Sequence, residues 1–246
     1  MHCLGQLFYY GLDGWSIEHM IIAALGGVSG NLPALEAVLS HIDRAGIHIV
    51  VNTGDTLVGG PNPNESWERL EKREVLSVQG ELDRQALRVV RKADSLPQRV
   101  SPALLAALQF AHEKTLSKNL EKISGLPRRR IFTVDGLSVC LCHGTPASQS
   151  EGLEEQDDPS RFRRQREFAN VHVIVAGRTP HAFSRMVDDT LFVNPGRVGT
   201  GKPGLAHYAI ISTEEHPWKV DIQKVVYDPT NVQKQLDSAG LQWPDW

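Results

Sequence analysis

The sequence is poor in cysteine, with three in 246 residues. Two of them, Cys140 and Cys142, lie two positions apart in an apolar run, so on a strand they would share one face. Three cysteines are too few for a disulfide scaffold, and this spacing is not that of a zinc knuckle. The sequence therefore predicts reduced thiols, which we interpret as the sign of a cytoplasmic protein.

Long apolar runs are also missing, since none reaches the roughly 18 residues that a membrane-spanning helix needs. The first 19 residues lack the charged segment and apolar stretch that mark a secretory signal. Met20 directly precedes the first strand-like run. We therefore expect no membrane contact. We interpret residues 1–19 as an N-terminal extension, either poorly ordered or upstream of the true start, ahead of a single domain over 20–246.

Net charge is small, because 26 Lys and Arg residues stand against 29 Asp and Glu residues, which gives −3 at pH 7. No overall basic field points to nucleic acid. Basic runs occur at 128–130 and 161–166, and the second follows an acidic run at 154–158. We interpret both as solvated, mutually neutralised faces rather than a polyanion site.

Strand-like and helical patterns alternate in the first half, which is typical of βαβ units and a parallel sheet. Strands are expected at 21–25, 48–52 and 74–80, and helices at 32–42, 67–74 and 82–124. Asn31 is expected to cap the first of these helices. Breaks near Pro97 and Pro102 divide the last one, which contains a helical insert over about 84–125.

The second half is richer in strands and turns. Asp135-Gly136 predicts a hairpin turn between two strand-like runs. Further strands are expected within 171–180, 190–196, 206–213 and 217–228, and the only helix expected here covers about 159–170. A parallel-leaning half that meets an antiparallel-leaning half predicts an α/β fold of two sheets packed face to face, with helices outside.

Six glycine-containing loops each follow a predicted strand. They read GGVSGN (26–31), TGDTLVGGPNPNE (53–65), QGELD (79–83), CHGTP (142–146), GRTP (177–180) and NPGRVG (194–199). In order and spacing they resemble the calcineurin-like metallophosphoesterases, most closely the small bacterial and archaeal phosphoesterase group, over about residues 20–225. The resemblance implies a four-layer α/β/β/α sandwich of two mixed sheets. It also implies a dinuclear metal centre at the strand ends, which activates water and clamps a phosphate.

In that family certain positions carry the metal ligands and the proton donor. At four of them this chain has a residue that can neither bind a metal nor donate a proton. The first-motif Asp and His of the family fall on Gly27 and Ser29. The His usually assigned as proton donor falls on Leu82, and the second His of the last pair falls on Pro180. One of the two metal sites thereby keeps only Asp55, and one carboxylate is not a ligand set. We therefore expect a degenerate active site.

The other site would consist of Asp55, Glu81, His143 and Arg178. Carboxylates and an imidazole suit Mn, Zn or Fe, whereas a guanidinium stays protonated and cannot ligate. In one interpretation Arg178 replaces the metal and satisfies both Asp55 and Glu81 as a structural ion pair. In the other, one divalent ion binds Asp55, Glu81 and His143, and Arg178 points at substrate phosphate.

Two functions therefore remain open. The first is a binding or scaffold protein that is inactive or severely impaired as an enzyme, with a small phosphate-containing ligand or a protein as partner. The second is a one-metal phosphoesterase acting on phosphodiesters or phosphomonoesters. Arg178, Asn31 and Arg197 are candidate phosphate contacts, and free amides at the helix start over 27–31 could hold an anion.

Overall fold

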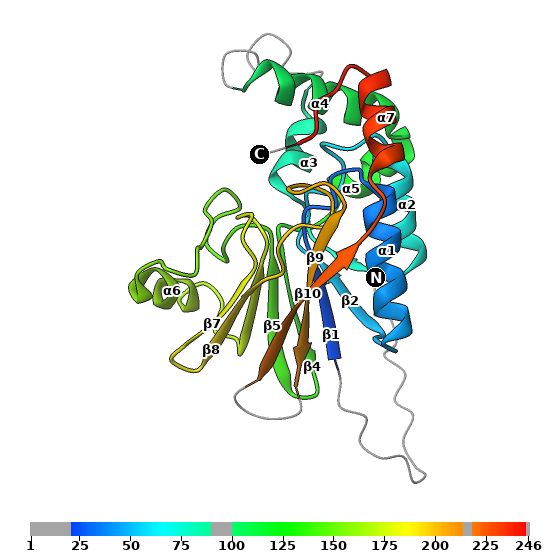
Figure 1. Ribbon diagram of the computed structural model, residues 1–246. Helices are drawn as coiled ribbons and strands as arrows, with labels where there is room; N and C mark the ends of the chain where they lie inside the picture. Colours follow the sequence, from blue (N-terminus) through cyan, green and yellow to red (C-terminus); the bar gives the residue numbers. More distant parts are fainter. Residues whose placement is uncertain (1–20, 90–99, 214–217, 245–246) are drawn as a thin grey trace, which may run out of the picture.

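The computed structural model describes residues 21–89, 100–213 and 218–244. The predictions for residues 1–19 and for a break near Pro97 lie outside them. Figure 1 shows two β-sheets that face each other, with helices on their outer sides. The predicted α/β sandwich of two mixed sheets is therefore confirmed.

The first sheet has the strand order β10-β9-β1-β2-β3. In this order the strands are Lys219–Val226, Leu205–Ser212, Ile21–Leu25, Ile49–Asn52 and Leu76–Ser77. β1, β2 and β3 pair in parallel, as the alternation of strands and helices predicts. β9 pairs antiparallel with both β1 and β10, so the sheet is mixed.

The second sheet has the order β4-β5-β6-β8-β7. These strands are Arg129–Val134, Leu137–Cys142, Val173–Ala176, Thr190–Asn194 and Phe183–Val187. β4 and β5 form the predicted hairpin, in which Asp135 and Gly136 have φ angles of 49° and 76°. Positive φ at both positions is what a type I′ turn requires. β5, β6 and β8 are parallel, and the edge strands β4 and β7 are antiparallel.

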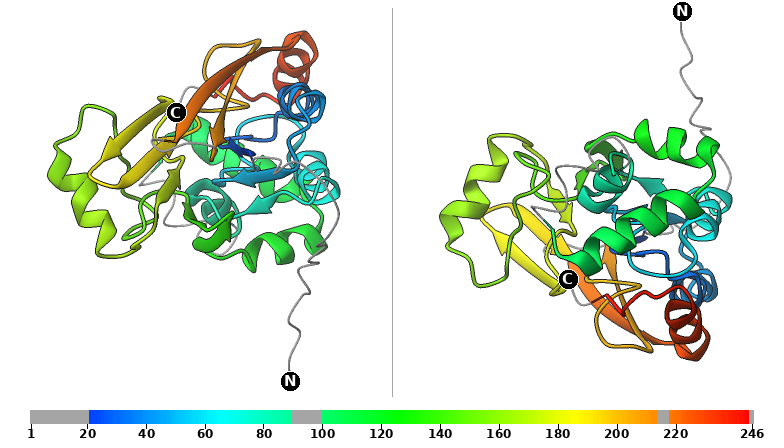
Figure 2. Two further views of the ribbon diagram at one scale, coloured as in Figure 1. Left: turned by 90° about the horizontal axis from the view of Figure 1, so that it is seen from below. Right: turned by 90° about the horizontal axis from the view of Figure 1, so that it is seen from above.

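Alternating side chains along the strands build the layers, because successive residues point to opposite faces. Ala23 and Leu25 pack under α1 (Leu32–Arg44) and α2 (Pro63–Lys72), whereas Ile22 and Ala24 pack against the second sheet. Across the molecule, α6 (Pro159–Arg166) covers the outer face of the second sheet (Figures 1 and 2). These three apolar interfaces make four layers.

The buried face of α6 explains the two neighbouring cysteines. Phe162 of α6 packs edge-on to Phe192 of β8, with ring centroids 5.0 Å apart. Cys140 and Cys142 are buried in the same cluster. The prediction that they share one strand face is therefore confirmed.

Three helices form a separate apolar cluster beyond the ends of the strands: α3 (Glu81–Ala86), α4 (Pro102–Lys114) and α5 (Ser117–Ser124). Trp67 of α2 and Leu57 belong to the same cluster. The predicted helical insert thus contains α4 and α5, while α3 starts before it. The longest helices of the described residues have 13 residues, and none of the helices there could span a bilayer.

Three helix predictions need correction. α2 begins at Pro63 rather than Trp67, because a proline suits the first helical turn. α6 ends at Arg166 rather than near Asn170. The prediction of one helix in the second half is wrong, since α7 (Thr230–Ser238) lies beside α1 (Figure 2). α7 is polar on most of its surface and buries only Val232 and Leu236, which gives a weak periodic signal.

Candidate functional site

Two glycines allow the loops at the carboxyl ends of the parallel strands to pack closely on one another. A Cβ atom on Gly80 would lie 2.0 Å from the backbone nitrogen of Asp55. A Cβ atom on Gly177 would lie 2.0 Å from Oγ1 of Thr53. No side chain fits at such distances, so these two glycines let the loops after β3 and β6 pack on the loop after β2. This packing places Asp55 at the centre of the loops.

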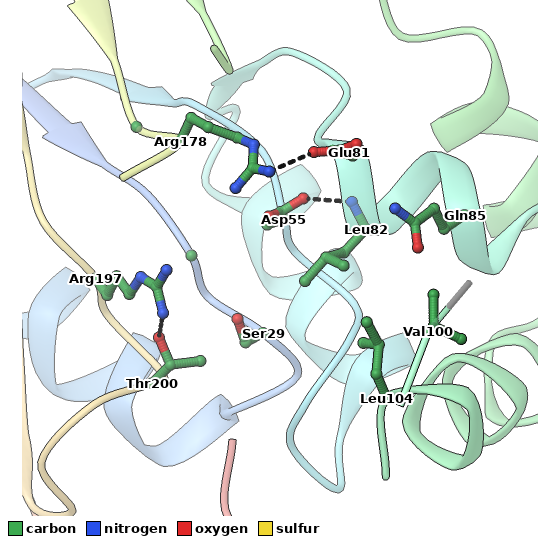
Figure 3. A pocket seen from close by; sticks show the side chains of 12 residues that line it. Ser29, Asp55, Glu81, Leu82, Gln85, Val100, Leu104, Arg178, Arg197 and Thr200 are labelled. Atoms are coloured by element: carbon green, nitrogen blue, oxygen red, sulfur yellow. Dashed lines mark hydrogen bonds and ion pairs between the residues drawn. The ribbon is translucent and has the colours of Figure 1, made fainter. Parts of the chain in front are cut away.

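A cavity of about 300 Å³ opens among these loops (Figure 3). It is lined by Gly27, Ser29, Asp55, Glu81, Leu82, Gln85, Val100, Leu104, Gly177, Arg178, Arg197 and Thr200. We call it the cleft. Most of the predicted site positions are therefore brought together. Asn31, His143 and Pro180 are not among the described residues that line it.

Asp55 has a strained backbone and a well-satisfied carboxylate. Its φ of 55° lies in the left-handed region, which side-chain-bearing residues rarely adopt and which clusters at functional sites. Oδ1 accepts a hydrogen bond of 2.8 Å from the backbone N–H of Leu82, as Figure 3 shows. Oδ2 lies 3.4 Å from Nε2 of His143. The strand end thus holds Asp55 by the start of α3 on one side and by an imidazole on the other.

His143 lies behind Asp55, with its side chain only 1% exposed. Its Nδ1 is 2.9 Å from the backbone oxygen of Thr53, so Nδ1 carries the proton and donates it there. That contact turns Nε2 toward Asp55, and Nε2 is buried without a hydrogen-bond partner in the structure. A histidine held in this way presents a ring nitrogen as metal-ligating histidines do.

Glu81, the third potential ligand, is paired with Arg178 instead of joining Asp55 and His143. Its Oε2 forms an ion pair of 2.9 Å with Nη2 of Arg178 (Figure 3). The predicted contact between Arg178 and Glu81 is therefore confirmed. The prediction that Arg178 also pairs with Asp55 is wrong. Among the described residues, the Asp55 carboxylate contacts the backbone N–H of Leu82 and the ring of His143 instead.

As arranged, these side chains do not fit a metal ion. No three His, Cys, Asp or Glu side chains converge as a ligand group anywhere in the described part of the chain. Asp55 and His143 face each other, but Glu81 is committed to a guanidinium that occupies a ligand position of the resembling family. The donor set is thus divided between an Asp–His pair and a Glu–Arg pair.

A second arginine takes up space beside the lost first-motif position. A Cβ atom on Gly27, which has a φ of 55°, would lie 3.3 Å from Cγ of Arg197. Nη1 of Arg197 lies 3.3 Å from Oγ1 of Thr200, to which it donates. Burial lowers the pKa of Arg197, and the charge of Asp55 opposes this shift. The loops around Gly27 therefore hold a partly desolvated guanidinium within the electrostatic reach of Asp55.

Asp83 is a buried carboxylate with a structural role that the sequence alone did not indicate. Its Oδ1 accepts from the backbone N–H groups of Thr56 and Leu57, and its Oδ2 accepts from that of Gly80. Burial, together with the nearby charge of Asp55, raises the pKa of Asp83 to about 6. Asp83 thus fastens the loop after β2 to the start of α3. The signal in the sequence that could have indicated this role is the position of Asp83 in the QGELD loop.

The apolar wall of the cleft was also missed. Leu82, at the lost proton-donor position, lines the cleft with Val100 and Leu104. Val100 and Leu104 come from the helical insert, so their position depends on tertiary packing that no local sequence pattern encodes. The cleft therefore combines two guanidinium groups with an apolar wall.

Asn31 has the predicted helix-capping role. Its Oδ1 accepts from the backbone N–H of Ala34, and its Nδ2 donates to Gly199 and Tyr227. The backbone N–H groups of Gly27, Ser29, Gly30 and Asn31 all donate to backbone carbonyls. The prediction that free amides there could hold an anion is wrong for these four, because the loop after β2 accepts from the first three and Val28 accepts from Asn31.

Comparisons with known proteins agree with this architecture. The sequence model of a family described as the calcineurin-like phosphoesterase superfamily domain matches residues 20–216. An uncharacterized protein of Methanocaldococcus jannaschii, MJ0912, is 24% identical over 92% of this chain and 95% of its own length.

Two solved structures have the same fold. The hypothetical protein PH1004 of Pyrococcus horikoshii OT3 has a TM-score of 0.81 at 20% identity, covering 92% of this chain and 95% of its own. A metallophosphoesterase of Sphaerobacter thermophilus has a TM-score of 0.69 at 24% identity, covering 91% and 95%. Because the family match covers most of the chain and the fold agrees, the protein belongs to the calcineurin-like phosphoesterase superfamily.

Proposed function

We propose that this protein is a binding member of the superfamily, which has lost its dinuclear centre and is inactive or severely impaired as a phosphoesterase. The observation that carries the proposal is the 2.9 Å ion pair between Arg178 and Glu81. It commits one potential ligand to a cation that cannot leave by deprotonation. A metal ion would have to displace Arg178 before it could reach Glu81.

The partner that suits the cleft is a small phosphate-containing ligand. Arg178 and Arg197 supply positive charge, and Ser29 and Thr200 supply hydroxyl groups on the same cavity. Guanidinium and hydroxyl donors are the usual protein partners of phosphate oxygens. Leu82, on the opposite wall, would cover an apolar part of the same ligand. We also propose a cytoplasmic location, because Cys140 and Cys142 are free thiols in β5.

A second candidate function is a phosphoesterase that uses one divalent ion, Mn, Zn or Fe, held by Asp55, Glu81 and His143. The observation that favours it is the buried Nε2 of His143, which points at Asp55 without a hydrogen-bond partner. This function requires Glu81 to leave Arg178.

Metal content and turnover distinguish the two functions. Protein purified without chelator is analysed for bound metal, and hydrolysis of bis-p-nitrophenyl phosphate is measured with Mn²⁺. We expect well below one ion per chain and no turnover above the rate of a His143→Ala variant. One ion per chain, lost together with turnover in His143→Ala, would overturn the proposal. Equal metal in both proteins would mean adventitious binding and would support it.

Ligand binding is tested separately, by titrating inorganic phosphate in the presence of EDTA. Arg178→Gln removes a charge-assisted contact, so we expect affinity to fall about tenfold or more. Arg164→Gln is the matched control, because Arg164 is exposed on α6 on the far side of the second sheet. Equal affinity in the Arg178→Gln and Arg164→Gln variants would contradict a phosphate site in the cleft.

A further inference from the structure

A second cavity, of about 290 Å³, lies outside the cleft. It is lined by Arg84, Arg128, Arg129, Thr145, Pro146, Ala147, Ser148, Gln149 and Ser150. We call it the arginine pocket. Arg84 comes from α3, Arg129 is the first residue of β4, Arg128 directly precedes it, and the rest come from the loop after β5. It shares no lining residue with the cleft.

The charge of the arginine pocket is not balanced. Three arginines line it, and none of its described lining residues is a carboxylate. Six other arginines pair with carboxylates, namely Arg69, Arg73, Arg161, Arg163, Arg166 and Arg178. Among the described residues, Arg84, Arg128 and Arg129 form no such pair. The prediction that the run at 128–130 is a neutralised face is therefore wrong for the described residues, where none of its three arginines pairs with a carboxylate.

Arg129 is held by hydrogen bonds, and Arg84 is partly buried. Nη1 of Arg129 donates to the backbone oxygens of Pro146 and Phe168, at 3.1 and 3.0 Å. Arg84 is half-buried, and its Nε is buried without a hydrogen-bond partner. A guanidinium that is partly removed from water without an anion nearby is unfavourable. An anion in the pocket would remove that cost.

The loop after β5 adds polar groups in a fixed position. Gln149 donates to the backbone oxygen of Gln79 at 2.5 Å, which ties the loop to the end of β3. Thr145 and Ser148 exchange backbone hydrogen bonds of 2.7 and 3.1 Å, which closes a tight turn. The hydroxyls of Ser148 and Ser150 lie 3.4 Å apart on this turn. These serine hydroxyls and the neighbouring arginines together offer the hydrogen-bond donors that phosphate oxygens need.

We infer that the arginine pocket binds a small, multiply charged phosphate anion of about the size of diphosphate, by means of Arg84, Arg128 and Arg129. Three positive charges suit an anion with more charge than a single phosphate. The volume lies at the lower end of small-molecule sites, which span about 300–1,000 Å³, so the ligand is small. This site is separate from the proposed function of the cleft, and either one stands if the other fails.

The test is a titration of full-length protein with inorganic pyrophosphate in EDTA, followed by the backbone amide NMR shifts of Thr145 and of residues 147–150, since Pro146 has no backbone N–H. We expect these shifts to move in the wild-type protein. In the double variant Arg84→Gln/Arg128→Gln the dissociation constant should rise about tenfold or more. The matched control Arg164→Gln and the cleft variant Arg178→Gln should both leave it unchanged.

The absence of shifts at Thr145 and residues 147–150 up to millimolar pyrophosphate would overturn the inference. An unchanged dissociation constant in the double variant would also overturn it. So would loss of pyrophosphate binding in the Arg178→Gln variant. If the double variant does not fold, as judged by circular dichroism, Arg128→Gln alone replaces it. Arg128 is exposed, so its removal should leave the fold intact, and the loss of this one charge-assisted contact should raise the dissociation constant about tenfold.

Discussion

Replacing Arg178 with histidine should complete a four-ligand metal site in the cleft. The change removes the guanidinium that holds Glu81 at 2.9 Å. It also adds an imidazole where the resembling family has one, as a fourth potential ligand beside Asp55, Glu81 and His143. Two carboxylates and two imidazoles are a complete set for Zn or Mn.

The size of the effect follows from the exposure of the ion pair. The side chains of Arg178 and Glu81 are 38% and 17% exposed. Losing such a partly solvated pair costs about 0.2–1 kcal/mol. For a chain of this length this lowers the melting temperature by up to about 4 °C in EDTA. A metal at 100 times its dissociation constant adds about 2.7 kcal/mol, which raises it by about 5–11 °C.

The assay is a thermal melt of three proteins with EDTA, Zn²⁺ or Mn²⁺, together with metal analysis. Arg178→Gln frees Glu81 without adding a ligand, so it is the matched control. We expect a metal-dependent rise in melting temperature only in Arg178→His, with about one ion per chain. An equal rise in the wild-type protein would refute the reasoning, because Glu81 would then be available despite Arg178. A folded Arg178→His variant that binds no metal would refute it too.

Three further substitutions test other parts of the site by urea denaturation. Asp83→Ala leaves three buried backbone N–H groups without their acceptor and should lower the free energy of unfolding by about 3 kcal/mol or more; a loss below about 1 kcal/mol would contradict its fastening role. Asn31→Ala removes a helix cap and two other hydrogen bonds and should cost about 2 kcal/mol. Its affinity for inorganic phosphate should stay the same, and weaker binding would show that Asn31 contacts the ligand after all. Gly27→Asp should destabilise more in the wild-type background than in Arg197→Ser, by at least about 0.5 kcal/mol, because the new Cβ meets Arg197; additive effects would show that the two positions are independent.

The layers of the fold could be predicted because each depends on a local pattern. Alternation along β1 assigns Ile22 and Leu25 to opposite faces, and a glycine-containing loop after each strand indicates the sheet edge where a site lies. β7 and α7 escaped prediction for one reason: both are short elements that bury only two side chains each. Their position depends on what they pack against rather than on their own sequence.

The candidate site was predictable by position but only partly by contact. The contact between Arg178 and Glu81 followed from the need of a recessed carboxylate for a partner once the metal ligands are gone. The partners of Asp55 did not follow from it. These partners are the N–H of Leu82 and the ring of His143. Their positions in space depend on how the start of α3 and the loop after β5 pack.

The two arginines of the cleft can balance the carboxylates of these loops without a metal ion. Asp55 and Glu81 stay partly buried, and two carboxylates in one cavity repel unless each has a compensating partner. Arg178 compensates Glu81 directly, and Arg197 is near enough to act on Asp55 electrostatically. A metal ion and a phosphate ligand must therefore break the same ion pair. The metal must take Glu81 from Arg178, whereas the phosphate must take Arg178 from Glu81, so the binding of one frees the side chain that the other needs.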